Sequence, residues 1–211
     1  MTPDELRLRL TEIVAQPQVA QPQVADPILG DEVANDLERP PVPAAVLVGV
    51  VLGEQPSVLL TKRTSHLTRH PGQISFPGGR IDPEDNGPEA AALREAREEI
   101  GLDAGSVEVL GRLTDHVTGT GYRITPVLAV VPPALTYQLS PHEVDAIFEL
   151  PMHVVLDPAS PRRQRQHVGG IWREYWVWPH PEHFIWGATA AILLQLAQRL
   201  RERTRLHQGV T

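Results

Sequence analysis

The sequence predicts an α/β fold in which a mixed β-sheet is sandwiched between α-helices. Two aliphatic runs, residues 46–52 and 58–61, have the length and the β-branched composition of buried strands. Helical signals occur after a Gly/Pro-rich segment in the middle of the chain and again near the C-terminus. Strands that alternate with helices over about 200 residues indicate one layered domain.

The N-terminal region predicts a helix followed by a linker. Residues 3–14 place Leu6, Leu10 and Ile13 at helical spacing. The next ten residues are the pentapeptide Ala-Gln-Pro-Gln-Val and its direct repeat, which proline interrupts. We therefore predict a helix and Pro-rich linker over residues 1–40, packed on or preceding the main domain, which spans residues 41–206. Residues 207–211 are predicted to be a tail.

The main domain begins with a predicted hairpin, because Gly-Glu-Gln-Pro separates the two aliphatic runs. A helix is then expected from Pro88, whose fixed φ suits a first turn, to Gly101, at a typical left-handed cap position. A long helix over about residues 187–203 closes the domain, with its leucines facing the body. The remaining predicted strands are residues 107–113, 122–131, 144–150 and 172–178.

Composition excludes several classes of function. The net charge is -7, so non-specific binding to nucleic acid is not expected. The longest apolar run, residues 44–52, is far shorter than the roughly 20 residues that span a bilayer. The chain has no cysteine and starts without an export signal, which fits a cytoplasmic protein. No nucleic acid or membrane partner is therefore expected, and a small anionic substrate would need a local basic patch. The sequence carries no signal for the oligomeric state.

The chemistry concentrates in three glutamates of the predicted helix. Glu95, Glu98 and Glu99 stand at i, i+3 and i+4, so their carboxylates converge on one face. Such crowding destabilises a helix unless a cation offsets it, and carboxylate oxygens favour hard ions, so Mg2+ or Mn2+ is expected. The alternative is a solvated acidic face on which Arg94 and Arg97 pair with the glutamates.

A glycine pair precedes this helix in the loop Phe76-Pro77-Gly78-Gly79. Glycines let a backbone approach a phosphate or metal closely. Together, the loop and the helix resemble the Nudix box, G-x5-E-x7-R-E-U-x-E-E-x-G-U with U aliphatic. Asp85 stands where the first Glu of the box belongs, and one extra residue separates it from Arg94. The matching residues are Gly79, Arg94, Glu95, Glu98, Glu99, Gly101 and Leu102.

The resemblance implies a Nudix fold and hydrolysis of a phosphoanhydride by water. It also implies that Glu95, Glu98, Glu99 and the Gly79 carbonyl bind the metal, and that Arg94 orients a carboxylate. Nudix enzymes often recruit their general base from outside the box, and Glu143 is the candidate because a similar loop precedes a strand in coenzyme A pyrophosphatases. The alternative for Glu143 is an exposed loop residue.

An upstream segment narrows the resemblance to the coenzyme A pyrophosphatases, whose signature is L-L-T-x-R-[S/A]-x3-R-x3-G-x3-F-P-G-G. Thr64 replaces Ser or Ala, and Thr68 occupies the second Arg position with Arg69 following it. A further segment, residues 185–189, is similar to one that recurs in these enzymes. The residues that fit are Leu59, Leu60, Thr61, Arg63, Gly72 and residues 76–79.

This narrower resemblance implies that coenzyme A is split into 4'-phosphopantetheine and adenosine 3',5'-bisphosphate. The expected substrate-binding residues are Arg63, Thr64, Arg69, Gly72 and Phe76, with the guanidinium groups at phosphate oxygens. Two other functions remain open: a Nudix diphosphatase for ADP-ribose, NADH or a nucleoside triphosphate, and a Nudix-fold binding module without turnover.

Two further clusters have two interpretations each. Arg162, Arg163 and Arg165 form either a solvated loop or a contact for a nucleotide phosphate. The tryptophans either pack the core or a subunit interface, which their alternation favours, or stack on adenine. These residues are Trp172, Trp176, Trp178 and Trp186.

Overall fold

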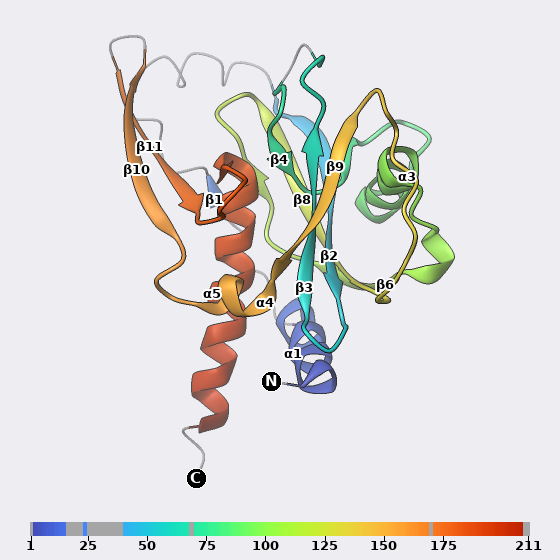
Figure 1. Cartoon of the computed structure of the whole chain (residues 1–211), viewed down its shortest axis with the longest axis vertical. Coiled ribbons are helices and arrows are strands. Elements are labelled where there is room, and N and C mark those ends of the chain that lie inside the picture. Colours follow the sequence, from blue (N-terminus) through green and yellow to red (C-terminus); the bar gives the residue numbers. More distant parts are fainter. Residues whose placement is uncertain (1, 16–22, 25–39, 68–69, 169–170, 209–211) are drawn as a thin grey trace.

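The computed structural model describes residues 2–15, 23–24, 40–67, 70–168 and 171–208 (Figure 1). The strands are β1 (Gln23–Val24), β2 (Val42–Val51), β3 (Ser57–Arg63), β4 (Ile74–Ser75), β5 (Gly78–Arg80), β6 (Glu108–Arg112), β7 (His116–Val117), β8 (Tyr122–Val131), β9 (Val144–Pro151), β10 (Arg162–Val168), β11 (Ile171–Trp178) and β12 (Ile185–Trp186). The helices are α1 (Pro3–Ala15), α3 (Pro88–Ile100), the 3-10 turn η2 (Ala104–Ser106), α4 (Met152–Leu156) and α5 (Gly187–Gln208).

The main sheet is mixed, as predicted. Its path runs β1-β7-β8-β2-β3-β4, with β5 on β2, β6 on β8 and β9 on β3. The long central strands β2 and β8 are parallel, and β3 lies antiparallel to both β2 and β9. The predicted hairpin is confirmed, because Val50 of β2 pairs with Val58 of β3. The α/β fold class is thus confirmed.

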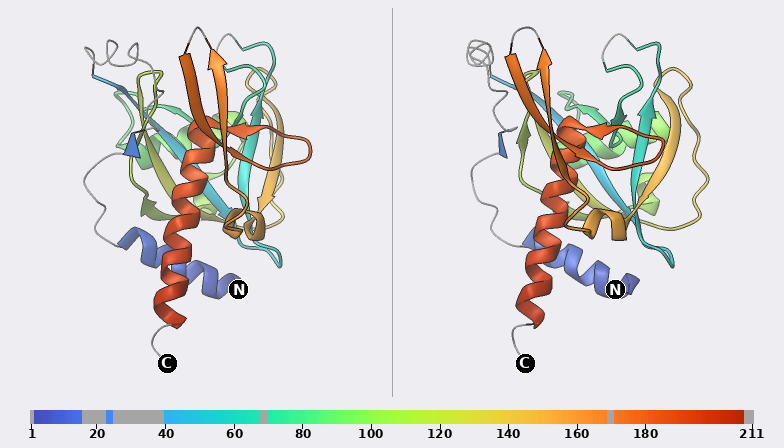
Figure 2. Two further views of the ribbon diagram at one scale, coloured as in Figure 1. Left: turned by 90° about the vertical axis from the view of Figure 1, so that its left-hand side faces the viewer. Right: turned by 60° about the vertical axis from the view of Figure 1, so that its left-hand side comes forward.

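Helices cover both faces of this sheet (Figures 1 and 2). Successive side chains of β2 alternate between two buried clusters, as strand geometry requires. Leu47 packs with the inner face of α3, which includes Ala92 and Ala96. Val48 packs on the other face, where α1 and α5 lie. The helix α3 therefore rests on one side of the sheet, and its outer surface is free to carry charged side chains.

The predicted bounds of α3 are confirmed at both ends. Pro88 is its first residue, and Gly101 follows its last residue with a left-handed φ of 67°. The Gly101 N–H donates to the Arg97 carbonyl at 2.9 Å, which satisfies a carbonyl that the helix end leaves free. The glutamates therefore sit on a helix with fixed ends.

The N-terminal helix is confirmed as α1, with Leu6, Leu10 and Ile13 buried. It packs beside α5, where the Arg199 guanidinium donates to the Ile13 carbonyl at 2.9 Å. In the predicted linker, Gln23–Val24 forms a short strand parallel to β7, because β7 leaves an edge open for pairing. Ala15, the first residue of the repeat, ends α1, and residues 16–22 lie outside the described residues. The predicted domain boundaries stay a prediction.

A second sheet, β10-β11-β12, leads into α5 and lies beside the main sheet (Figure 2). The predicted core role is confirmed for Trp178, which is fully buried, whereas the Trp172 side chain is 56% exposed. Arg162, Arg163 and Arg165 lie in β10, so the predicted loop is wrong, whereas their exposed side chains agree with the predicted solvated cluster. Arg163 and Arg165 both pair with Glu174. Among the described helices, none has the combination of length and apolar character that a bilayer crossing needs.

Candidate active site

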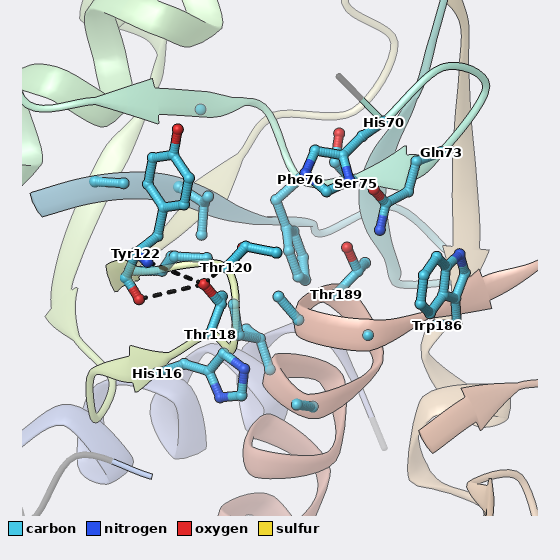
Figure 3. A pocket seen from close by; sticks show the side chains of 18 of the residues that line it. His70, Gln73, Ser75, Phe76, His116, Thr118, Thr120, Tyr122, Trp186 and Thr189 are labelled. Atoms are coloured by element: carbon cyan, nitrogen blue, oxygen red, sulfur yellow. Dashed lines mark hydrogen bonds between the residues drawn. The ribbon is translucent and has the colours of Figure 1, made fainter. Parts of the chain in front are cut away.

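A pocket of about 510 Å³ lies between the main sheet and the start of α5. One wall carries the glycine loop and the inward face of α3, including Gly79, Glu95 and Glu99. The opposite wall is aromatic and aliphatic, with Trp176, Trp186 and Ile192. Figure 3 shows Phe76 in the middle of the pocket, with Tyr122 on one side and Trp186 on the other. A pocket with carboxylates on one side and rings on the other suits a substrate that has a charged centre and a less polar arm.

The glycine loop places backbone where side chains would not fit. Gly78 has φ 153°, and a Cβ there would collide with the backbone of Ala45 and Val46. Gly79 lies against the Glu95 carboxylate so closely that a Cβ would overlap it. The loop is fixed because the Leu47 N–H donates to the Pro77 carbonyl at 2.8 Å. The two glycines therefore bring main chain into contact with the first acidic side chain of the predicted site.

Glu99 is the buried acid of the site, with a side chain that is 2% exposed. Its Oε2 accepts the Gly78 N–H at 3.3 Å, and its Oε1 lies 3.6 Å from Nη1 of Arg63. Burial raises the pKa of Glu99 to about 8; Arg63 opposes this shift, and the Glu95 and Glu143 charges add to it. Glu95 responds in the same direction, since burial raises its pKa and Arg94 opposes the shift.

Arg94 ties the rest of the acidic cluster together. Its Nη1 donates to Glu95 Oε1 at 3.0 Å and to Glu98 Oε2 at 3.2 Å. Its Nε and Nη2 grip the two oxygens of Asp85 at 3.0 and 2.9 Å. Glu98 is 56% exposed and is not part of the pocket lining. Asp85, at the first Glu position of the box, is thus the partner of Arg94, and Glu98 stands at the outer edge.

Glu143 also lines the pocket, although it precedes β9, far along the chain. Thr64 positions this loop, because its N–H donates to the Glu143 carbonyl at 2.9 Å and its hydroxyl donates to the His142 carbonyl at 3.1 Å. Thr64 and Gly72 do not line the pocket; the Gly72 N–H donates to the Thr64 carbonyl at 3.3 Å. Arg69 lies outside the described residues. Of the predicted substrate-binding residues, the structure places Arg63 and Phe76 at the pocket.

The donor set fits a hard divalent cation. Carboxylates that raise one another's pKa form a region of negative potential that a cation would neutralise. In the described part of the chain, no three acidic or histidine side chains already form a closed metal site. Instead, Arg63 pairs with Glu99 and Arg94 pairs with Glu98, so a cation would compete with two guanidinium groups.

The sequence interpretation missed several residues of the pocket. Arg80 directly follows the glycine pair, and that position was the available signal for it. The others gave no local signal, because elements distant in sequence, β7, β8, the turn between them and α5, bring them here. They are His116, Thr118, Thr120, Tyr122 and Ile192.

Comparison with known proteins agrees with this geometry. The model of the NUDIX domain matches residues 41–182. The chain belongs to the Nudix family. "Uncharacterized Nudix hydrolase NudL" of Enterobacter sp. (strain 638) is 43% identical over 162 residues, which cover 74% of this chain and 82% of that protein. The protein of that name from Escherichia coli (strain K12) is 41% identical over the same shares.

Solved Nudix structures resemble this protein at lower sequence identity. A Caenorhabditis elegans Ap4A hydrolase binary complex is 18% identical with a TM-score of 0.48, covering 80% of this chain and 98% of that one. The family match and the NudL relatives make this chain a Nudix pyrophosphate hydrolase, a class that generally uses divalent metal ions.

Alanine substitutions at the two loop glycines should have different effects in this Nudix hydrolase, one on activity and the other on stability. Gly79→Ala should displace the Glu95 carboxylate and lower metal-dependent activity by at least about tenfold while the protein stays folded. Gly78→Ala should instead unfold the protein several degrees earlier, because it strains φ and strikes backbone. Thermal unfolding and initial rates measure both. Equal melting temperatures in the two variants would contradict this division.

Proposed function

We propose that this Nudix hydrolase splits the pyrophosphate of coenzyme A and its derivatives, with Mg2+ or Mn2+ as cofactor. The products would be 4'-phosphopantetheine and adenosine 3',5'-bisphosphate. The observation that carries the proposal is that residues of the segment resembling the coenzyme A pyrophosphatase signature line the pocket that holds the acidic side chains. Arg63, Phe76 and Gly79 of that segment line the same pocket as Glu95 and Glu99.

The proposed roles follow from the contacts. Glu95, Glu98, Glu99 and the Gly79 carbonyl would hold the metal, and Arg94 orients Glu95 and Glu98 through its hydrogen bonds. A bound divalent cation supplies charge neutralisation for the pyrophosphate and acidifies water. Glu143, at the pocket and outside the helix, is the proposed acceptor of the proton from the attacking water. Arg63, which lies beside Glu99, would neutralise phosphate oxygens of the substrate.

Thr64 and Gly72 support this site indirectly. Their hydrogen bonds hold the turn after β3 against the loop that carries Glu143. The positive φ of Gly72, 68°, suits a glycine in that turn. The predicted substrate-binding roles of these two residues become positioning roles in the proposal, and Arg69 stays a proposed phosphate contact.

The test is a comparison of substrates under matched conditions. The full chain is incubated with coenzyme A, ADP-ribose, NADH and a nucleoside triphosphate, each with Mg2+, with Mn2+ and with chelator. Mass spectrometry should find 4'-phosphopantetheine as the fastest-forming product, and chelator should abolish it. Faster cleavage of ADP-ribose or NADH would assign another diphosphatase activity, and binding without any product would assign a non-catalytic module.

A further inference from the structure

Two arginines among the described residues line the pocket, and they have different partners. The Arg63 guanidinium lies beside the buried Glu99, so its charge acts within the acidic wall. Arg80 is exposed and forms no ion pair with any carboxylate of the described ranges; Asp82 acts on it only as a more distant charge and pairs with Arg94. The hydrogen-bond partner of Arg80 is a neutral phenol: its Nη2 donates to the Tyr122 hydroxyl at 3.2 Å. Arg80 therefore has a charge available for an anion.

Both the backbone and the side chain of Arg80 are held in place. Arg80 in β5 pairs with Ala44 of β2, and Tyr122 in β8 pairs with Val42 on the other side of β2. The Arg80 guanidinium lies 5.8 Å from the centroid of the Tyr122 ring. The Arg80 carbonyl accepts a hydrogen bond from Arg94 Nη2 at 3.0 Å. Arg94 thus connects α3, through Glu95 and Glu98, to the strand β5 that carries Arg80.

The surroundings of Tyr122 add polar donors. The Thr118 and Thr120 hydroxyl oxygens are 3.0 Å apart, and the Tyr122 N–H donates to the Thr118 hydroxyl at 3.0 Å. Figure 3 shows these three residues at one end of the pocket and Trp186 at the other. A guanidinium next to hydroxyl groups is the donor set that binds phosphate oxygens. The polar end of the pocket therefore suits a phosphate, and the aromatic end does not.

We propose that Arg80 and Tyr122 form a second phosphate subsite, which binds a phosphomonoester of the substrate that lies outside the scissile pyrophosphate. Arg80 makes the charged contact, and Tyr122 positions it. The identity of this group as the 3'-phosphate of coenzyme A rests on the proposed function. In this arrangement Arg63 acts at the scissile pyrophosphate, and Arg80 distinguishes substrates that carry the extra phosphate from those that lack it.

The test measures binding by isothermal titration calorimetry on the full chain with Mg2+. The two probes, adenosine 3',5'-bisphosphate and adenosine 5'-monophosphate, differ only in the 3'-phosphate. The parent protein should bind the bisphosphate about tenfold more tightly, since one charge-assisted contact is lost with the other probe. Arg80→Gln should bring the two affinities to within about twofold. Tyr122→Phe, which removes only the hydroxyl, should give an intermediate ratio.

Arg123→Gln is the matched control, because Arg123 is the neighbour of Tyr122 in β8, is 46% exposed and pairs with Asp115 at 3.8 Å outside the pocket. It removes the same charge and should keep the parent ratio. An unchanged ratio in Arg80→Gln, equal weakening of both probes, or a ratio near one in the parent protein would overturn the proposal. A preserved preference without cleavage of coenzyme A would defeat the proposed function and leave the subsite standing.

Discussion

Glu99→Gln should abolish metal-dependent hydrolysis while making the metal-free protein more stable at neutral pH. Loss of a carboxylate that holds the cation should cost roughly a thousandfold in rate. The stability gain arises because Glu99 is buried and its pKa is raised from 4.5 to about 8. Glutamine keeps the shape and can still accept the Gly78 N–H, but it has no charge to bury.

The sign of the pH effect follows from that shift. The folded protein holds the Glu99 proton more tightly than the unfolded chain does, so the folded state is favoured below pH 4.5. The contribution of Glu99 to the unfolding free energy is lost as pH rises from 4.5 through about 8, and it is on the order of a few kcal/mol. Urea unfolding in chelator should show this loss in the parent and a smaller loss in Glu99→Gln, where the raised pKa of Glu95 remains.

Glu98→Gln is the matched control on the same helical turn. As a second proposed metal ligand, Glu98 should lower the rate to a similar extent when it is replaced. Because its side chain is exposed, the replacement should change the unfolding free energy by less than about 0.5 kcal/mol. Near-parent rates in either variant would show that the metal assignment is wrong. An unchanged pH slope in Glu99→Gln would show that another group causes the loss of stability.

Arg94→Lys should destabilise the protein and slow hydrolysis, because lysine keeps the charge but loses the planar fork. The fork contacts Asp85, Glu95, Glu98 and the Arg80 carbonyl, which span the loop and the helix. We expect a loss of about 2 kcal/mol in unfolding free energy and a rate at least about tenfold lower. Arg97→Lys, one turn along on the exposed surface, should change neither.

Asp85→Asn completes a double-mutant cycle with Arg94→Lys. If Asp85 serves as the brace of Arg94, the two losses should be non-additive by about 1 kcal/mol or more. Asp85→Asn alone should leave the Mg2+ affinity within about threefold of the parent value, whereas a ligand would lose far more. Additive losses with a large fall in Mg2+ affinity would place Asp85 among the metal ligands.

The elements that the sequence predicted correctly are those with local causes. The bounds of α3 depend on Pro88 and Gly101, and the first hairpin depends on two aliphatic runs and the turn between them. The proximity of Gly79 and Glu95 could be predicted for the same reason, since only a short segment joins the glycine loop to α3. The alternative interpretation of the acidic face also holds in part, because Arg94 pairs with Glu95 and Glu98.

The residues that sequence reasoning missed depend on long-range topology. Tyr122 reaches Arg80 because β8 runs parallel to β2, and such a pairing leaves no periodic mark in either strand. The contact between Arg63 and Glu99 likewise joins a strand end to a helix 36 residues later, as their numbers show. The extra residue between Asp85 and Arg94 shifts Asp85 out of register with the Nudix box. The pairing of Asp85 with Arg94 is therefore visible only in the folded loop.

The position of α5 limits how this protein can be shortened. The family match ends at residue 182, yet Trp186 and Ile192 of the apolar wall come afterwards. So does the pocket residue Thr189, whose hydroxyl donates to the Ile74 carbonyl at 2.9 Å. A fragment trimmed to residues 41–182 would keep every acidic side chain of the pocket, and it would keep Trp176 but lose the rest of the apolar wall. A contact that holds β4 beside the pocket is thus made by residues that the family match does not cover.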